Sequence, residues 1–230
     1  MIEFVFLDMD DTILDFHKAE QIALSTTLRQ FGLEPTEVVC ARYSQINRQH
    51  WERLETRELT RDQVVVGRFD VLFREFGISA DARTVALTYE QHLSAGHYFL
   101  PGAEEALQRL ASRYKLYLAS NGTSHVQWPR LRSAGLEQYF REIFVSQDMG
   151  ADKPSPEYFN ACFARIPGFD VSRAIMVGDS LTSDIRGGIN TGMRTCWVNP
   201  AHKKGREDIP ADYEIENLSQ LEDLLDAIDN

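Results

Sequence analysis

The sequence is poor in cysteine: its 230 residues include three, Cys40, Cys162 and Cys196, which lie far apart. An odd number of widely spaced cysteines argues against a disulfide framework or a zinc site, and it predicts reduced thiols in a cytoplasmic protein. No apolar run approaches the ~20 residues that span a bilayer. The chain starts directly with a strand-like segment, without the pattern of a signal peptide. We therefore expect no membrane partner.

Positive charge is also scarce. Lysine and arginine number 24 against 35 aspartates and glutamates, which leaves a net charge of −11 and a pI of about 5.0. Such a surface repels nucleic-acid phosphates, so we expect no nucleic-acid partner. Small anionic substrates remain compatible with it, because one lysine and one divalent cation reverse the sign of a local pocket. The six histidines show no HExxH spacing, which argues against zinc-protease chemistry.

The hydrophobic pattern changes character early in the chain. The run Ile2 to Leu7 is rich in β-branched and aromatic residues, as is typical of a buried strand. Helical composition follows Leu14, in segments at 15–31, 36–54, 64–76 and 80–93, the third preceded by the capping box Thr60–Gln63. We predict an all-helical insertion over residues 15–95.

Helical and strand patterns alternate in the rest of the chain. The expected helices lie at 103–112, at 124–134, after Pro156, at 181–190, and after a second capping box, Ser219–Glu222. The expected strands are 114–120, 143–146, 174–179, 194–198 and 212–215. Repeated βα units predict an α/β fold with a parallel sheet and right-handed crossovers. Residues 1–14 and 96–230 would form this core.

The first strand ends in three carboxylates, Asp8, Asp10 and Asp11. In open α/β sheets, ligands bind outside the carboxyl ends of the strands. Carboxylates at ~4 Å repel each other by roughly 4 kcal/mol at an effective dielectric constant of ~20. A cation, usually Mg²⁺ acting alongside a substrate phosphate, would gather these oxygens. The alternative is a strand that runs into an ordinary acidic turn.

Polar residues also follow three later strands. Ser120-Asn121 follows the second, Lys153 lies after the third, and Asp179 ends the fourth, with Asp184 shortly after it. Each alone is compatible with a turn, a helix cap or a surface loop. Together they predict a carboxylate pair, a hydroxyl, a cation and a second carboxylate pair at one sheet edge. This set suits phosphoryl transfer to a carboxylate, with a second aspartate that protonates the leaving oxygen.

The chain resembles the haloacid dehalogenase (HAD) superfamily, because the four motifs of that superfamily occur here in order. Asp8-Met-Asp10-Asp11-Thr12 is similar to D-x-D-x-T, and Ser120, Lys153 and Gly178-Asp179-Ser-Leu-Thr-Ser-Asp184 are similar to the other three. The resemblance implies a Rossmann-like parallel sheet of order 3-2-1-4-5, with or without a sixth edge strand, and an inserted helical cap. It also implies hydrolase chemistry that depends on Mg²⁺.

The resemblance assigns expected roles to these residues. Asp8 would be the nucleophile and Asp10 the general acid and base. Mg²⁺ would be held by Asp8, the backbone carbonyl of Asp10 and Asp179, with Asp184 in support. Ser120, Asn121 and Lys153 would bind the phosphoryl group, and Lys153 would also take part in catalysis. Asp10 favours phosphate esters as substrates, because a departing halide needs no protonation.

A finer resemblance is to the bacterial pyrimidine 5'-nucleotidases of the superfamily. It is carried by the stretches Asp11–Phe16, Arg68-Phe69, Asn121-Gly122 followed by Gln127, Asp179–Gly188 and Thr195–Pro200, which include cap and peripheral positions that catalysis does not dictate. There are two departures from the usual pattern. Pro129 lies in the helix after Ser120, and proline suits only the first turn of a helix. Asp11 stands where many superfamily members have glycine.

The resemblance implies hydrolysis of UMP, dUMP and dTMP, and the cap would have to recognise the base. The cap candidates are aromatic or polar residues: Phe16, Asn47, Trp51, Arg68 and Phe69. Ordinary cap packing is the alternative for Trp51 and Phe69, and a salt-bridged surface position is the alternative for Arg68. A sugar-phosphate phosphatase or phosphomutase, and a non-catalytic binding module, are alternative functions for the same motifs.

Overall fold

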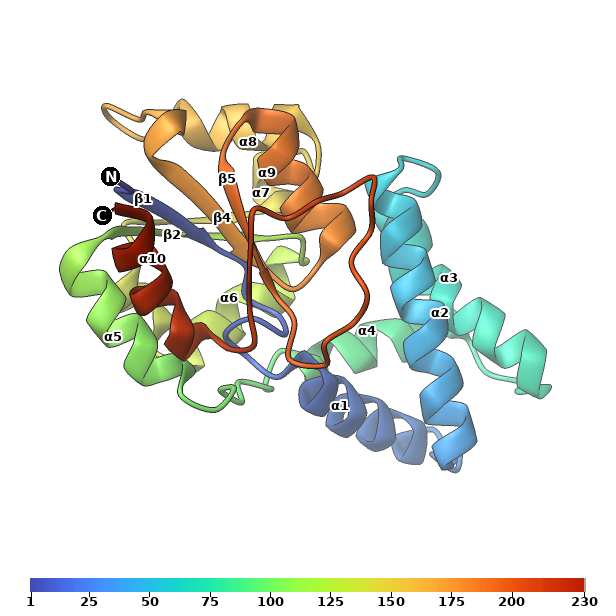
Figure 1. Ribbon diagram of the computed structural model, residues 1–230. Helices are drawn as coiled ribbons and strands as arrows, with labels where there is room; N and C mark the ends of the chain where they lie inside the picture. Colours follow the sequence, from blue (N-terminus) through green and yellow to red (C-terminus); the bar gives the residue numbers. More distant parts are fainter. Residues whose placement is uncertain (230) are drawn as a thin grey trace.

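The computed structural model describes residues 1–229, so Asn230, the last residue of the predicted core, lies outside the described residues. Six parallel strands form one sheet of order β3-β2-β1-β4-β5-β6 (Figure 1). The strands are β1 (Phe4–Leu7), β2 (Lys115–Ser120), β3 (Glu142–Val145), β4 (Ala174–Gly178), β5 (Arg194–Val198) and β6 (Tyr213–Ile215). The predicted parallel α/β core, including its sixth edge strand, is confirmed.

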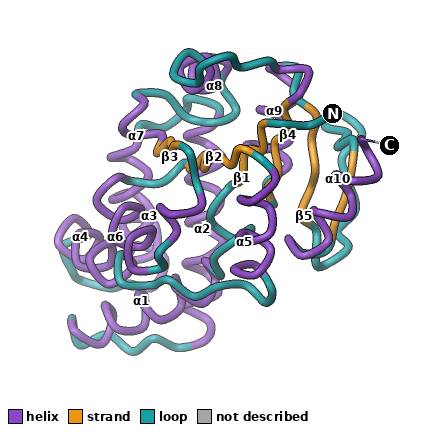
Figure 2. The backbone as a smooth tube through the Cα atoms, turned by 90° about the vertical axis from the view of Figure 1, so that its left-hand side faces the viewer, coloured by secondary structure: helices purple, strands orange, loops and turns teal. Residues whose placement is uncertain are grey.

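Helices cover both faces of this sheet, as Figure 2 shows for α5 and α8. One face packs on α5 (Ala103–Arg113), α6 (Ser124–Ser133) and α10 (Leu221–Asp229), and the other on α8 (Pro156–Phe163) and α9 (Arg186–Thr191). Alternate residues of β1 enter the two clusters: Val5 and Leu7 join the first, Phe4 and Phe6 the second. Burial on both faces explains why the first strand reads as a continuous apolar run.

Four helices of the inserted region pack on one another beside the sheet (Figure 1). They are α1 (Phe16–Gln30), α2 (Glu37–Glu55), α3 (Arg61–Phe76) and α4 (Ala82–Leu93). Aspartate or threonine side chains cap the N-terminus of each, and the predicted capping box Thr60–Gln63 is formed. The helices share an apolar cluster that includes Tyr43, Phe69 and Tyr89. The domain limits at residues 15 and 95 stay a prediction.

The second predicted capping box is wrong. Asn217 Oδ1, two residues upstream of Ser219, accepts the Ser219 N–H at 3.1 Å and starts a short 3₁₀ turn before α10. Glu222 does not return to the helix start, because it accepts hydrogen bonds from Arg109 at 2.8 Å and Arg113 at 3.0 Å. An asparagine two residues earlier and two arginines of α5 therefore outcompete the local motif.

Three smaller observations concern individual elements. Ser146, expected in the third strand, begins the short helix α7 (Ser146–Met149). The helix expected at 181–190 is a π-helical turn, Leu181–Ile185, that leads into α9. Pro129 is the sixth residue of α6, beyond the first turn that suits proline best.

All three cysteines are free thiols, and Cys162 and Cys196 are buried. Among the described residues, none of the helices combines the length and the apolar character that crossing a membrane would require.

A glycine in α9 leads to a stability prediction. A Cβ added at Gly187 would lie 2.4 Å from Cε2 of Phe159, which is fully buried. We expect Gly187→Ala to lower the free energy of unfolding by ~1–3 kcal/mol, as overpacking does. Gly67 in α3 is the matched control, because a Cβ there would meet only the His50 side chain, at 3.4 Å. Gly67→Ala should be neutral or stabilising by up to ~1 kcal/mol. Urea unfolding measures both, and a Gly187→Ala protein as stable as the wild type would contradict the prediction.

Candidate active site

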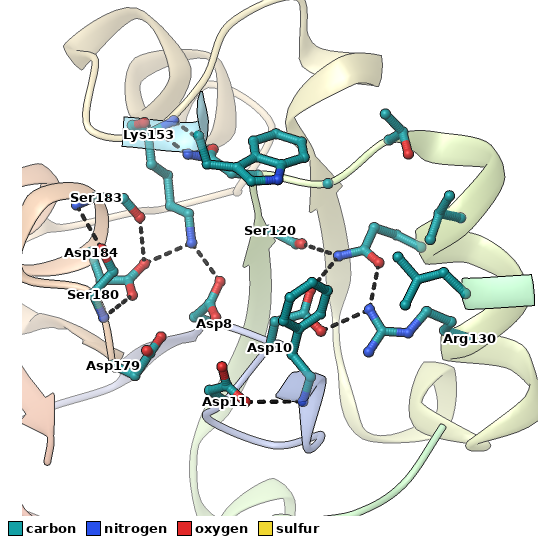
Figure 3. Close-up of a pocket in the computed structure, with 18 of the residues that line it drawn as sticks. Asp8, Asp10, Asp11, Ser120, Arg130, Lys153, Asp179, Ser180, Ser183 and Asp184 are labelled. Carbon is teal, nitrogen blue, oxygen red and sulfur yellow. Dashed lines mark hydrogen bonds and ion pairs between the residues drawn. The ribbon is translucent and has the colours of Figure 1, made fainter. Parts of the chain in front are cut away.

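The polar residues predicted at the strand ends lie together at the carboxyl edge of the sheet (Figure 3). They line one cavity of about 190 Å³ between the sheet and the cap helices. The predicted residues in its wall are Asp8, Asp10, Ser120, Asn121, Lys153, Asp179 and Asp184. Because they lie at or beyond the carboxyl ends of β1, β2, β3 and β4, the parallel topology is what gathers them.

Lys153 lies at the centre of the charged groups. Its Nζ donates to Asp8 Oδ1 at 2.6 Å, to Asp184 Oδ1 at 2.7 Å and to the Ala119 carbonyl at 2.6 Å. Asn121 fixes the lysine backbone, because its Oδ1 accepts the Lys153 N–H and its Nδ2 donates to the Lys153 carbonyl, both at 2.8 Å. Burial alone would lower the pKa of Lys153, but Asp184 and Asp8 raise it above its ordinary value. The lysine is therefore a permanent cation.

One lysine cannot neutralise the carboxylates around it. Oxygens of Asp8, Asp179 and Asp184 lie within 4.8 Å of one another. Burial raises the pKa of Asp8 to about 8, with Lys153 opposing the rise and Asp184 and Asp10 adding to it. Burial, with repulsion from Asp184 and Asp8, also raises the pKa of Asp179 well above its usual range. Three oxygen donors with excess negative charge fit a hard divalent cation such as Mg²⁺.

Gly178 gives the fourth motif its compact geometry. A Cβ at this position would lie 2.1 Å from Asp184 Oδ2, so a side chain here would displace the carboxylate. The same Oδ2 accepts the backbone N–H of Ser180 at 3.0 Å, while Oδ1 accepts from Lys153. Asp184 is thus held on both oxygens and is fully buried.

Two residues of α6 surround Asp10. Gln127 Nε2 donates to Asp10 Oδ2 and to Ser120 Oγ, both at 2.8 Å. Arg130 Nη1 forms an ion pair with Asp10 Oδ1 at 2.7 Å, and Arg130 Nε donates to the Gly96 carbonyl at 2.7 Å. Arg130 and Gln127 are also joined, at 2.9 Å. Gln127 therefore links Asp10 to the Ser120 hydroxyl, and Arg130 links it to the Gly96 carbonyl, at the end of the inserted helices.

Gln127 and Arg130 were not predicted as residues of the site. The available signal is their spacing of three residues on the helix that follows Ser120, which places both on one helix face. A buried position for two polar residues could not be inferred from that spacing. A polar pair on a helix normally lies in solvent.

Asp11 adopts a left-handed backbone conformation, with φ of 56°. This conformation explains why glycine is common at this position, since only glycine and a few short polar residues enter the region readily. Asp11 Oδ1 accepts the Phe16 N–H at 3.0 Å, at the start of α1. Burial raises the pKa of Asp11 to about 6.

Three of the five cap candidates line the cavity: Phe16, Trp51 and Arg68. Arg68 is 2% exposed, so the alternative of a salt-bridged surface residue is wrong. Phe69 lies outside the cavity wall, fully buried against Tyr43 with ring centroids 5.0 Å apart. The structure therefore gives Phe69 the cap-packing position.

Asn47 also lies outside this cavity wall and contacts Arg68 instead. Its Oδ1 accepts from Arg68 Nη1 at 2.8 Å, and its Nδ2 donates to Glu20 Oε1 at 2.7 Å. Arg68 Nη2 is buried and has no hydrogen-bond partner among the described residues. Asn47, itself held by Glu20, thus orients Arg68 and leaves its Nη2 group available to a ligand.

Two cap carboxylates in the cavity wall, Glu55 and Glu90, were not predicted. Burial raises the pKa of Glu55 to about 7. Glu90 accepts from Thr123 Oγ1 at 3.2 Å and lies 3.1 Å from His125 Nε2, so it contacts the core. Nothing in the sequence separates these glutamates from the many others on helical surfaces.

Comparisons with known proteins agree with this geometry. The family model "haloacid dehalogenase-like hydrolase" matches residues 2–192. YfnB of Bacillus subtilis, whose name assigns it to the HAD hydrolases, is 41% identical over 221 residues, which cover 96% of this chain and 94% of YfnB. A crystal structure of YfnB, whose description reports bound magnesium and interdomain movement, has a TM-score of 0.93 and covers 97% of this chain and 98% of that one.

Two further relatives have named substrates. The pyrimidine 5'-nucleotidase PynA of Streptococcus pneumoniae is 35% identical, over 97% of this chain and 95% of PynA. The pyrimidine 5'-nucleotidase YjjG of Escherichia coli is 29% identical, over 97% of both chains. The similarity therefore extends through the core and the inserted helices.

The carboxylate cluster leads to a prediction about pH. Without a divalent cation, the free energy of unfolding should fall as pH rises from about 5 to 8. The pKa of Asp8 is about 8 in the fold, against about 3.9 when unfolded. The native state therefore binds more protons than the unfolded state over this interval, which makes the slope negative. Removing one carboxyl group of the cluster by Asp179→Asn should flatten the slope, whereas the exposed control Asp70→Asn should not.

Urea unfolding in excess chelator, repeated with saturating Mg²⁺, measures this effect. Mg²⁺ should stabilise the protein most at the high-pH end, where the carboxylates are ionised. Stability that stays level or rises with pH in the metal-free protein would contradict the prediction.

Proposed function

Because this chain belongs to the haloacid dehalogenase-like hydrolases, we propose that it is a Mg²⁺-dependent phosphomonoesterase that hydrolyses pyrimidine nucleoside monophosphates such as UMP, dUMP and dTMP. One observation carries the phosphatase part: Asp8, Asp10, Lys153 and Asp179 line a single cavity beneath the cap. The similarity to two pyrimidine 5'-nucleotidases supports the substrate class.

In the first half-reaction, a carboxylate oxygen of Asp8 attacks phosphorus. The bond from phosphorus to the ester oxygen breaks, and Asp10 gives its proton to the departing nucleoside oxygen. The product is an aspartyl-phosphate on Asp8. Lys153 and Ser120 hold the phosphoryl oxygens during this step, through positive charge and a hydroxyl donor.

In the second half-reaction, water replaces the nucleoside. Asp10, now a carboxylate, takes a proton from water as the water oxygen attacks phosphorus. The acyl-phosphate P–O bond breaks, which releases inorganic phosphate and returns Asp8 to its starting state. Gln127 contacts Oδ2 of Asp10, and Arg130 contacts its Oδ1. These contacts fix the orientation of the carboxyl group for both proton transfers.

The proposed metal site consists of Asp8, the backbone carbonyl of Asp10 and Asp179, with Asp184 in support. Bound Mg²⁺ would neutralise charge on the carboxylates and on the phosphoryl oxygens. The excess negative charge of the cluster supports this assignment. The magnesium reported for YfnB supports it independently.

The cap side of the cavity suits a flat, partly polar leaving group. Phe16 and Trp51 offer aromatic faces, and Leu93 and Val126 add apolar surface. Arg68 would donate a hydrogen bond to a base carbonyl through its spare Nη2. Asn47 orients that arginine and would act on specificity only indirectly.

Replacing the proposed nucleophile should abolish turnover. Asp8→Asn has a poorly nucleophilic amide in place of the attacking carboxylate, so we expect phosphate release to fall by at least ~10³-fold. The fold should persist, because the change removes one of several crowded negative charges. Phosphate release and circular dichroism test both statements, with the exposed Asp62→Asn as control. If Asp8→Asn retained a tenth of wild-type activity, the aspartyl-phosphate mechanism would be wrong.

The leaving-group proposal predicts an ordered substrate panel. UMP, dUMP and dTMP should have a higher kcat/KM than AMP, and a hexose phosphate should be poor because it cannot stack on the aromatic rings. Phe16→Ala should cost roughly 1–3 kcal/mol for UMP, if base stacking resembles that of single-strand binding. It should cost much less for glycerol phosphate. Comparable kcat/KM for dUMP, AMP and the hexose phosphate would contradict pyrimidine recognition.

The same panel separates the alternative functions. A phosphomutase would isomerise a sugar phosphate without releasing phosphate. A sugar-phosphate phosphatase would release phosphate from the hexose ester faster than from UMP. A non-catalytic module would release none, even from a generic aryl phosphate.

A further inference from the structure

Arg61 is the first residue of α3, and its side chain leaves the cap to contact the core. The capping box fixes this end of the helix, since the Thr60 N–H donates to Gln63 Oε1 at 2.8 Å. The guanidinium lies 5.6 Å from the ring centroid of Trp51, and 16% of the Arg61 side chain is exposed. Arg61 is thus a largely buried cation whose guanidinium is oriented toward the core.

The guanidinium has four oxygen partners, all of them in the core. Nη1 donates to the carbonyl oxygens of Asn121 at 3.3 Å and Gly122 at 3.0 Å. Nη2 donates to Ser146 Oγ at 2.7 Å and forms an ion pair with Asp152. A planar guanidinium can bridge several acceptors in this way, whereas a lysine ammonium acts as a point charge.

These partners belong to the segments that carry the phosphate side of the site. Asn121 follows Ser120 directly, and Asp152 precedes Lys153. The side chain of Asn121 already joins the two segments through its paired hydrogen bonds with the Lys153 backbone. Arg61 adds a second connection between them, from the cap. A shift of Asp152 would move Lys153 away from Asp8, which its Nζ contacts at 2.6 Å.

We propose that Arg61 is a positioning residue for phosphoryl transfer, which holds Asn121–Gly122 and Asp152–Lys153 at the separation that one bound phosphoryl group requires. This inference rests on the proposed phosphatase function and is independent of the base that the cap recognises. The phosphate-binding segments are held in place only while the cap contacts the core, because the Arg61 side chain that connects them belongs to α3. Arg61 thereby connects the part that recognises the leaving group to the part that performs the chemistry.

A second cap–core ion pair provides a matched control. Arg57 Nη2 lies 3.0 Å from Glu157 Oε2, and these side chains are 69% and 62% exposed. The pair joins the cap to α8, outside the segments that contain Ser120 and Lys153. Exposed pairs of this kind contribute little energy. Arg57→Gln therefore removes a cap–core contact without disturbing the phosphate-binding segments.

The test compares Arg61→Gln, Arg61→Lys, Asp152→Asn and Arg57→Gln in the full chain. The measurements are kcat and KM with p-nitrophenyl phosphate, the dissociation constant of inorganic phosphate with Mg²⁺ present, and thermal unfolding. Arg61→Gln should lower kcat at least ~10-fold and weaken phosphate binding, because small misplacements of aligned groups are costly. Arg61→Lys should recover little, since an ammonium cannot bridge four acceptors. Arg57→Gln should stay within about twofold of wild type.

The double variant Arg61→Gln/Asp152→Asn gives a separate readout. Its kcat should be no lower than that of Arg61→Gln alone, because both changes break the same interaction. Unchanged kcat and phosphate affinity in Arg61→Gln would overturn the proposal, whether or not the unfolding temperature falls. An equal loss in Arg57→Gln would also overturn it, because any cap–core contact would then suffice.

Failure of the proposed function is distinguishable from failure of this inference. Equal kcat/KM values for nucleotides and hexose phosphates would remove the pyrimidine specificity and leave the aryl phosphate comparison intact. If the wild-type protein hydrolysed no phosphate ester, the phosphatase proposal would fail. The affinity of Arg61→Gln for inorganic phosphate, against that of Arg57→Gln, would still decide the positioning role.

Discussion

The single lysine shared between Asp8 and Asp184 is the interaction on which the rest of the site depends. Its ammonium is almost completely buried and contacts both carboxylates directly. With Asp179 close by, the ionised carboxylates would outnumber the one ammonium, and the pKa of Asp8 is raised to about 8. That imbalance is the electrostatic basis of the proposed Mg²⁺ requirement. An anionic ester can approach such a centre only once a further cation compensates the carboxylates.

The fold makes this centre possible by bringing separate chain segments to one edge of a parallel sheet. Gly178 lets the Asp184 carboxylate lie against the backbone, where any side chain would collide with it. Around Asp10, Arg130 links the acid to the Gly96 carbonyl at the end of the inserted helices. Arg61 reaches from α3 to the segments around Asn121 and Asp152. The inserted helices therefore contact both the proposed acid and the proposed phosphate-binding side.

Much of the core was predictable because its signals are local. Apolar runs that end in carboxylates or Ser-Asn mark strands and their carboxyl ends, and the expected sheet order is confirmed. The capping box at Ser219 failed because Asn217 and two arginines of α5 offered better partners than the local pattern. Gln127 and Arg130 were not predicted as site residues, because polar residues three apart on a helix usually face solvent. Asn47, one of the expected cap candidates, contacts Arg68, and no local pattern indicates that contact.

The sequence by itself determined which segments become strands and helices, and which charged residues stand at strand ends. It could do so because periodicity and the position of a residue within its element are properties of neighbouring residues. The tertiary structure decided which cap residues face the cavity, that Arg61 contacts the core, and that Asp10 is held from α6. These outcomes depend on the rotation and docking of whole helices, which bring together residues far apart in the chain. No local pattern specifies such a contact, because its energy arises only when both partners are packed in place.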